Sequence, residues 1–240
     1  MAQIFSRWHN DAPRYTFIAI VILGALGTFA AYYWMSPLNT DVGYAPEQPI
    51  PYSHKLHAGD MAMDCRYCHA YVERGPHAGV PATQVCMNCH RQVKADSPKL
   101  AALRESWDKG TPIAWKRIHK VPDFAYFDHS AHVGVGVRKN RAAIGCETCH
   151  GRIDTMEVVR QEKPLSMSWC VDCHNNPAPN LRPVDAITQM GWAPSPTWRD
   201  EAARIATSLN PPGRFTDAQM KKADGTVVTF ATAGCSGCHR

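Results

Sequence analysis

All ten cysteines of the chain lie in five copies of the pentapeptide Cys-x-x-Cys-His. In this motif the two thiols form thioethers with the vinyl groups of a haem, and the histidine supplies an axial nitrogen to the iron. A spacer of two residues fits one helical turn, so both sulfurs face the same edge of the porphyrin. The sequence therefore predicts five covalently bound haems c with their iron, and no thiol is left over.

We number these motifs 1 to 5 along the chain. The predicted attachment residues are, in motif order, Cys65 and Cys68, Cys86 and Cys89, Cys146 and Cys149, Cys170 and Cys173, and Cys235 and Cys238. The predicted proximal axial ligands of the irons are the histidines that end the motifs, which are His69, His90, His150, His174 and His239.

Three other kinds of site use closely spaced cysteines: zinc sites, disulfide frameworks and redox-active thiol pairs. None of them requires a histidine directly after the second cysteine. With 12 histidines in 240 residues, chance would place one there in all five copies with a probability on the order of 10⁻⁷, given the motif definition. The pattern therefore favours haem attachment over all three alternatives.

Two pairs of histidines are the strongest candidates for the sixth ligands of the irons. His54 and His57 precede motif 1, and His129 and His132 precede motif 3. Residues three apart share one face of a helix, so the two imidazoles of a pair can reach two different, closely stacked haems. We therefore predict these four histidines as distal axial ligands.

The other candidate ligands are single residues. His119, ahead of the second pair, is the fifth predicted distal ligand, whereas His77 lies in a Gly-Pro-His-Ala-Gly segment and is also interpreted as a loop residue. His9 is excluded because it precedes the apolar segment described below. Methionine stays open as a ligand of one haem, although most methionines are expected to be packing residues. The methionines outside the apolar segment are Met61, Met63, Met87, Met156, Met167, Met190 and Met220.

Coordination decides which function these irons can have. An iron with two histidine ligands has no vacant site, so it carries electrons and binds no substrate, while a His/Met haem would have a higher potential. All five motifs end in histidine, and the lysine found there in some multihaem reductases is absent. The sequence therefore favours electron transfer with no catalytic residue in this chain. The alternative from another class is an oxyanion reductase, which needs one haem with an open site.

Residues 15–35 form an uncharged stretch long enough for a transmembrane helix. Twenty-one residues rise about 31 Å in a helix, which matches the hydrocarbon core of a bilayer. Arg7 and Arg14 precede the stretch, and Asp41 and Glu47 follow it. The positive-inside rule then predicts a cytoplasmic N-terminus and haems on the outer side. The alternative is a cleaved signal peptide, for which the Thr-Phe-Ala sequence at 28–30 would be a tolerable site.

The rest of the chain is organised around a repeat. Each unit has a His-x-x-His pair followed by two haem motifs, and the contexts of the pairs also match: Tyr-Ser-His-Lys-Leu-His at 52–57 and Phe-Asp-His-Ser-Ala-His at 127–132. This indicates a duplicated two-haem module. The predicted organisation is a cytoplasmic N-terminus 1–14, an anchor 15–35, a proline-rich linker 36–51, a first two-haem module 52–110, a second two-haem module 111–180, and a C-terminal segment 181–240 with the fifth haem.

Composition limits the kind of fold and the kind of partner. Five haems in 240 residues leave fewer than 50 residues for each, so the macrocycles must supply much of the buried apolar area. We predict a mainly α fold with much irregular structure, of the multihaem cytochrome c type, on a single N-terminal transmembrane helix. The formal charge of +5 would be more than offset by ten haem propionates. No basic run or phosphate-binding motif indicates nucleic acid or nucleotides.

Three local elements are also predicted outside the motifs. A helix over 97–110 would have Ser97 as its N-cap, Pro98 in its first turn and Gly110 at its end. A second short helix covers roughly 198–209 and stops at an Asn-Pro-Pro-Gly sequence. A short β-prone run at 226–230 precedes motif 5.

With these pieces in place, the chain resembles the membrane-anchored pentahaem cytochrome subunit of alternative complex III. The resemblance spans nearly the whole sequence and includes the N-terminal anchor and extended blocks around the motifs: residues 52–59, 65–69, 80–83, 86–90, 115–123, 127–132, 149–151 and 165–174. These blocks are far more specific than the haem motifs alone. His77 departs from what is expected of the family at that position.

The resemblance implies a part in a respiratory quinol oxidoreductase of a bacterial inner membrane. The pentahaem subunit would carry electrons from quinol oxidation, which occurs in partner subunits, towards a soluble cytochrome c or a terminal oxidase. The implied partners are an iron–sulfur subunit, polytopic quinol-binding subunits and a monohaem cytochrome subunit. The alternative within electron transfer is a cytochrome that feeds a periplasmic reductase.

Overall fold

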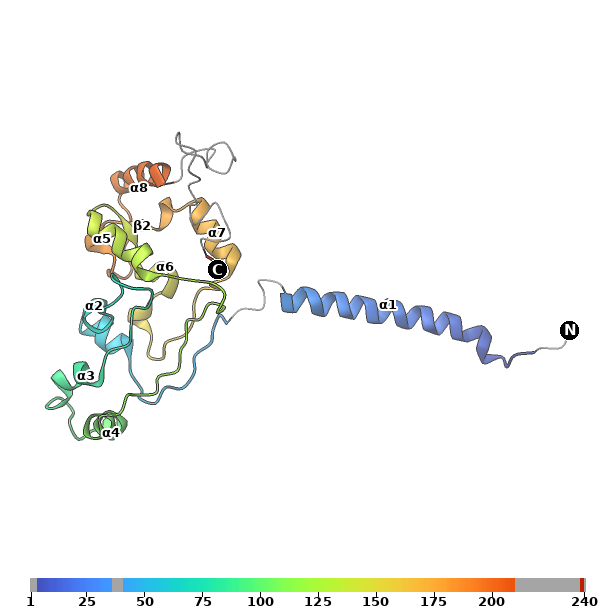
Figure 1. Cartoon of the computed structure of the whole chain (residues 1–240), viewed down its shortest axis with the longest axis horizontal. Coiled ribbons are helices and arrows are strands. Elements are labelled where there is room, and N and C mark those ends of the chain that lie inside the picture. Colours follow the sequence, from blue (N-terminus) through green and yellow to red (C-terminus); the bar gives the residue numbers. More distant parts are fainter. Residues whose placement is uncertain (1–3, 36–40, 210–237, 240) are drawn as a thin grey trace. The chain divides into compact units, whose positions relative to one another are not determined.

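The computed structural model describes residues 4–35, 41–209 and 238–239. The chain divides into two compact units, Met1–Thr40 and Asp41–Arg240, which are described separately (Figure 1). The residue Cys235, the β-prone run at 226–230 and most of the segment between 210 and 240 lie outside the described residues.

The first unit is built on one long apolar helix, α1 (Trp8–Met35). It begins seven residues before the predicted stretch and contains Pro13 near its start. None of its residues is buried, and the mean hydropathy of its most apolar window is 1.8. By length and composition this helix could cross a membrane, and a signal sequence near an N-terminus has the same properties.

In the second unit, four haem motifs lie on short helices, as the spacing of their cysteines predicts. These are α2 (Cys65–Cys68), α3 (Thr83–His90), α6 (Cys146–His150) and α7 (Met167–Asn175). Two of them begin at a side-chain cap. The Asp64 carboxylate accepts the Arg66 backbone N–H at 2.8 Å, and the Ser166 hydroxyl accepts that of Trp169 at 3.4 Å. Such caps satisfy amide groups that a helix start would otherwise leave unpaired.

The remaining elements of the second unit are also short. They are η1 (Lys55–Asp60), η2 (Pro98–Leu100), α4 (Ala101–Lys109), η3 (Ser130–Gly134), α5 (Val135–Lys139), η4 (Ile153–Thr155), η5 (Ala178–Asn180), η6 (Val184–Ala186) and α8 (Pro196–Leu209). Two strands, β1 (Ala143–Ile144) and β2 (Leu181–Arg182), pair antiparallel with Ala143 opposite Arg182. The described part of the chain is therefore mainly helical with much irregular structure, as predicted.

The two helices predicted outside the motifs are present with small differences. The first is split into a 3-10 turn, η2, and α4, and Gly110 ends α4 with a φ of 63° in the left-handed region. Ser97 makes no side-chain cap in the structure, so that part of the prediction was wrong. The second helix, α8, begins at Pro196, two residues earlier than expected.

Buried apolar residues form three small clusters instead of one core. One joins Ile50, Met87 and Leu103 between α3 and α4. The second surrounds Val72, Val133, Ala143 and Ile187, and the third packs α8 on β2 through Leu181, Ala202, Ile205 and Ala206. Small separate clusters are what a short chain can form when most of its residues are committed to loops and single turns.

The close approach of α5 to the segment before β1 gives a test of this packing. A Cβ at Gly136 would collide with the backbone carbonyl of Ala142. We expect Gly136→Ala to lower the free energy of unfolding by about 1–3 kcal/mol, because backbone must shift to admit the methyl group. Gly75→Ala is the matched control, since a Cβ at Gly75 meets nothing within 4 Å. Thermal unfolding of the two variants measures the difference, and equal midpoints would contradict the predicted collision.

Candidate haem-binding sites

The two His-x-x-His segments have the same local structure. His54 immediately precedes η1 and His57 lies within it, while His129 immediately precedes η3 and His132 lies within it. Both η1 and η3 are π-helical, a form that is found most often as a single turn at functional sites. The sequence repeat is therefore matched by a repeat of backbone conformation in these two segments.

One aromatic ring holds both histidines of each pair. The Tyr52 ring meets His54 edge-on at 4.8 Å between centroids and stacks on His57 at 4.4 Å. Phe127 does the same with His129 at 4.8 Å and with His132 at 4.7 Å. Because the two angles also agree closely, 84° and 88° edge-on, 22° and 25° stacked, each ring fixes its imidazoles in the same way. Both aromatic residues lie in the matching sequence contexts of the repeat, but the sequence did not predict that they hold the imidazoles.

The Nδ1 atoms of six candidate ligands are directed at backbone carbonyl oxygens. A carbonyl only accepts, so Nδ1 must carry the hydrogen and Nε2 holds the lone pair. This is the tautomer and orientation that metal-bound histidines usually have. The Nδ1–O distances are 2.8 Å for His57 to Ser53, 2.6 Å for His69 to Gly79, 3.0 Å for His90 to Val93, 2.7 Å for His129 to Pro76, 2.8 Å for His132 to Asp128 and 3.1 Å for His239 to Phe124.

Three pairs of histidine rings have the separation expected for two ligands on opposite sides of one metal. A nitrogen–metal bond is about 2 Å and the ring centre lies about 1 Å behind the nitrogen, so the two centroids should be about 6 Å apart. The centroids are 6.2 Å apart for His57 and His90, 5.9 Å for His132 and His174, and 6.3 Å for His129 and His150. Each pair joins a predicted distal ligand to a predicted proximal ligand. The residues present therefore fit a haem iron.

Burial keeps several of these imidazoles in the neutral form that binds a metal. Removal from water is the largest cause that lowers the pKa of His54 to about 4 and that of His150 to about 3. The same cause lowers the pKa values of His129 and His174. Neutral imidazole is the ligating form. His54 also has a buried Nδ1 without a hydrogen-bond partner, a cost that a protein rarely accepts in a core without function.

His119 lies beside a predicted proximal ligand in an unexpected arrangement. Its ring meets that of His150 edge-on at 4.3 Å, which is too close for the two rings to face each other across one metal. Its Nε2 is buried without a hydrogen-bond partner, and burial lowers its pKa. The structure therefore places His119 against the predicted proximal ligand of motif 3.

The other candidate ligands differ in their exposure. His77 is exposed, and its charge is one of the smaller causes of the lowered pKa of His129. Met87 and Met156 are buried packing residues at 6% and 2% exposure, as expected for most methionines. Met167, which precedes motif 4, is 67% exposed.

The nine described cysteines all carry free thiols, so none of them forms a disulfide in the structure. Burial raises the pKa of the Cys149 thiol to about 12 and also raises the pKa values of Cys170 and Cys173. Among the described residues, no three or more His, Cys, Asp or Glu side chains converge on a point where a metal ion could lie.

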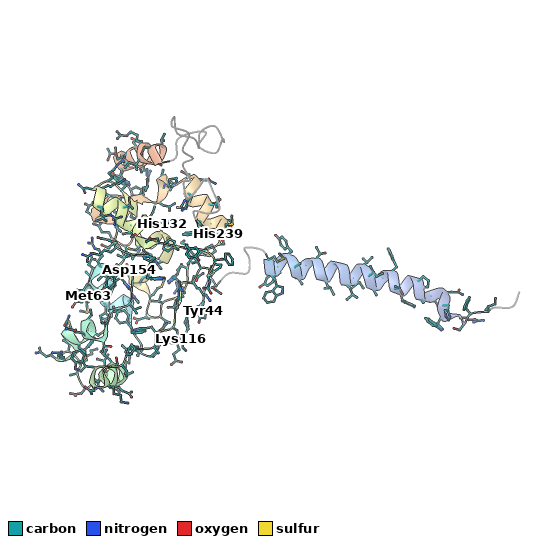
Figure 2. The ribbon with its side chains drawn as sticks, in the orientation of Figure 1. Tyr44, Met63, Lys116, His132, Asp154 and His239 are labelled. Atoms are coloured by element: carbon teal, nitrogen blue, oxygen red, sulfur yellow. The ribbon has the colours of Figure 1, made fainter. Side chains whose placement is uncertain are left out.

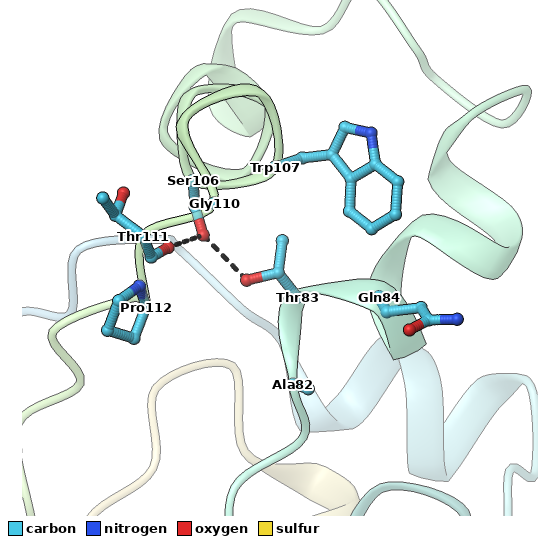
Figure 3. Close-up of a pocket in the computed structure, with 8 residues that line it drawn as sticks. All are labelled: Ala82, Thr83, Gln84, Ser106, Trp107, Gly110, Thr111 and Pro112. Atoms are coloured by element: carbon cyan, nitrogen blue, oxygen red, sulfur yellow. Dashed lines mark hydrogen bonds between the residues drawn. The ribbon is translucent and has the colours of Figure 1, made fainter.

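A separate pocket lies beside α3 and contains none of the candidate ligands (Figure 3). Its volume is about 360 Å³. The Thr83 and Ser106 hydroxyls hydrogen-bond across it at 2.7 Å, and Ser106 donates to the Thr111 carbonyl at 2.5 Å. Figure 2 shows the side chains of the haem-motif unit, with His132 and His239 labelled. The predicted distal and proximal histidines form the candidate site, and this pocket is separate from it.

Comparison with known proteins gives one informative similarity. No family model matches the chain. The chain is similar to a protein of Nitratidesulfovibrio vulgaris described as the multihaem cytochrome c subunit of menaquinone reductase, with 36% identity over 105 residues. The match covers 43% of this chain and 46% of the relative, so the chain spans about half the length of the relative it matches.

The role of the aromatic rings gives a prediction with an internal control. We expect Tyr52→Ala to lower the free energy of unfolding by about 2–3 kcal/mol, because the ring that holds His54 and His57 is lost. Tyr52→Phe should have almost no effect, since Phe127 holds the second pair without a hydroxyl group. Thermal unfolding and the visible spectrum report both outcomes. A large effect of Tyr52→Phe would show that the hydroxyl group, and not the ring, is what matters.

Proposed function

We propose that this chain is a pentahaem c-type cytochrome, the electron-carrying subunit of a membrane complex that exchanges electrons with quinone. The three histidine pairs about 6 Å apart carry this proposal. Each pair places a predicted distal ligand opposite the histidine of a Cys-x-x-Cys-His motif. The similarity to a multihaem subunit of menaquinone reductase supports both the cofactor and the type of complex.

The ligand sets follow from the distances between rings. His57 would complete the iron at His90, His132 the iron at His174, and His129 the iron at His150. His54 is assigned to the iron at His69 because, after burial, His69 is the largest cause of the lowered pKa of His54. His119 is the fifth proposed distal ligand, supported by its unpartnered Nε2.

The residues of this chain hold the ligands ready for electron transfer. A bis-histidine haem supplies a one-electron couple without a vacant coordination site. Carbonyl groups fix the direction of Nε2 in six of the candidate ligands, and the Tyr52 and Phe127 rings restrict rotation of the paired imidazoles. His54 and His150 are half-buried, so the charge change of an electron step would occur partly removed from water. The alternative, an oxyanion reductase, would need one haem iron without a sixth ligand.

The complex that we propose is alternative complex III, on the basis of the sequence resemblance. Helix α1 would anchor the chain in a bacterial inner membrane with its N-terminus in the cytoplasm and the five haems on the periplasmic side. An iron–sulfur subunit, polytopic quinol-binding subunits and a monohaem cytochrome subunit would complete the complex. Electrons would pass from quinol towards a cytochrome c or a terminal oxidase.

A second candidate reverses the direction of electron flow. The relative is described as part of a menaquinone reductase, a complex that delivers electrons to quinone. The same chain of haems serves either direction, because a haem couple is reversible and the relative potentials of the ends decide the flow. In this second candidate, the chain would exchange electrons with a periplasmic enzyme.

Haem content and one ligand variant test the proposed cofactors. We expect five haems c per chain from the pyridine haemochrome, all in the low-spin state. His57→Ala should convert one haem to the high-spin state, judged from optical and EPR spectra, because its iron loses the sixth ligand. His77→Ala, at an exposed position outside the pairs, should leave the spectra unchanged. Unchanged spectra in His57→Ala would remove His57 from the ligands, and an absence of haem would refute the function.

Mild detergent extraction tests the proposed assembly and the direction of flow. We expect the chain to leave the membrane with an iron–sulfur subunit and polytopic partners, identified by mass spectrometry. Menaquinol added to the purified complex should reduce the haems if electrons enter from quinol. Reduction of added menaquinone by prereduced haems, with no reaction of menaquinol, would favour the second candidate. Isolation of the chain alone would contradict both assemblies.

A further inference from the structure

The order of the haem motifs in space differs from their order in the sequence. Motifs 1 and 2 are joined through their spacers, since the Asn88 amide donates to the Tyr67 hydroxyl at 3.1 Å. Asn88 lies between the cysteines of motif 2 and Tyr67 between those of motif 1. The first two attachment sites are therefore direct neighbours.

Motif 1 is also tied to motif 3, across the boundary between the two predicted modules. The Ile187 carbonyl accepts the Cys146 N–H at 3.1 Å, and the adjacent Thr188 hydroxyl donates to the Asp64 carboxylate at 3.1 Å. Asp64 caps the start of α2, and Cys146 starts α6. One dipeptide thus fixes the N-terminal ends of both motif helices.

The attachment side chains themselves meet at this boundary. The Cys65 and Cys146 thiols are close enough in space for each to shift the pKa of the other, lowering that of Cys65 and raising that of Cys146. Where these free thiols stand, thioethers would join the chain to the edges of two haems. Because the thioether edges would lie side by side, the haems of motifs 1 and 3 would be in close contact.

Motifs 3, 4 and 5 follow each other through shared elements. His129 and His132 are three residues apart and face the rings of His150 and His174, so one short segment serves motifs 3 and 4. The same segment continues back to Tyr126, whose N–H donates to the Cys238 carbonyl of motif 5 at 2.7 Å. Ala125 also forms an isolated antiparallel bridge with His239.

We propose that the five haems form a line in the order 2–1–3–4–5, in which electrons cross between the two modules at the haems of motifs 1 and 3. Thr188 is a positioning residue for that crossing. This inference rests on the proposed function. Each step would transfer one electron from a reduced iron to its oxidised neighbour, so no bond would form or break. The haems of motifs 2 and 5 are then the two ends, where external partners deliver and remove electrons.

The imidazole planes supply a marker for the haem of motif 3. The rings of His129 and His150 are nearly parallel at 4°, whereas the other two pairs cross at 62° and 70°. Parallel axial imidazoles give low-spin ferric haem an ordinary rhombic EPR signal, and strongly crossed ones give a highly anisotropic signal. The loss of a rhombic signal in His129→Ala identifies the one that belongs to motif 3.

Two variants of the same His-x-x-His pair test the order. Methionine in place of a distal histidine raises the potential of that haem, so it can be reduced alone and become diamagnetic. His54→Met marks the haem of motif 1, and His57→Met marks that of motif 2. The full-length membrane-bound protein is poised at one electron per chain, and the loss of the marked haem's own signal confirms which haem is reduced. The spin–lattice relaxation of the motif 3 signal is then measured.

A neighbouring paramagnetic iron speeds relaxation, and this effect falls steeply with distance. We expect reduction of the marked haem to slow the relaxation of the motif 3 signal in His54→Met and to leave it unchanged in His57→Met. Slowing in His57→Met alone, or in neither variant, would overturn the order although the haems are present. A protein without low-spin haem signals would instead refute the proposed function.

Thr188 offers a test that leaves every ligand intact. Thr188→Val removes the hydrogen bond to Asp64 with little change of shape, and Thr188→Ser keeps the hydroxyl. We expect slower relaxation of the motif 3 signal in the oxidised Val variant and recovery in the Ser variant, with haem content unchanged. Thr155→Val, which removes a similar exposed hydroxyl hydrogen bond to the Arg152 carbonyl, is the matched control. Equal relaxation in Thr188→Val and the natural protein would overturn the positioning role.

Discussion

The hydrogen bond from a histidine Nδ1 to a backbone carbonyl is the interaction on which the candidate site depends. An imidazole that donates from Nδ1 has one remaining lone pair, on Nε2, and its direction is fixed by the position of the carbonyl group. Six candidate ligands are held in this way. Since the donors come from both the distal and the proximal sets, the same physical device orients both sides of the proposed irons.

This device explains why the haem-motif unit contains so much irregular structure. A carbonyl group inside a helix is already bonded to an amide group of the next turn, whereas one outside a helix has no such partner and is more readily available to a side chain. Gly79, Pro76 and Phe124 lie in loops, and their carbonyl groups accept from His69, His129 and His239. Loops therefore supply carbonyl groups that orient the candidate ligands.

Sequence reasoning succeeded where a single local segment contains the whole signal. The helical turns of motifs 1 to 4 follow from the spacing of their cysteines, and the pairing of His54 with His57 follows from a separation of three residues. It could not find contacts between distant segments. The carbonyl group that orients His129 belongs to Pro76, 53 residues away, and no local pattern marks it. The position of His119 against His150 also results from tertiary packing. The sequence therefore did not indicate which iron His119 could serve as a distal ligand.

The matching rings of Tyr52 and Phe127 show which part of the repeat was under physical constraint. Tyr52 has a hydroxyl group and Phe127 does not, but both have the same aromatic ring. The shared requirement is therefore an aromatic ring in contact with both imidazoles. This aromatic ring fixes the angle between the two imidazoles of one pair, and the angle determines which two irons the segment can reach. If each segment serves two haems, a second copy of the segment adds two more haems without a new ligand geometry. The tie of motif 1 to motif 3 would then be the feature that turns two such copies into one continuous path.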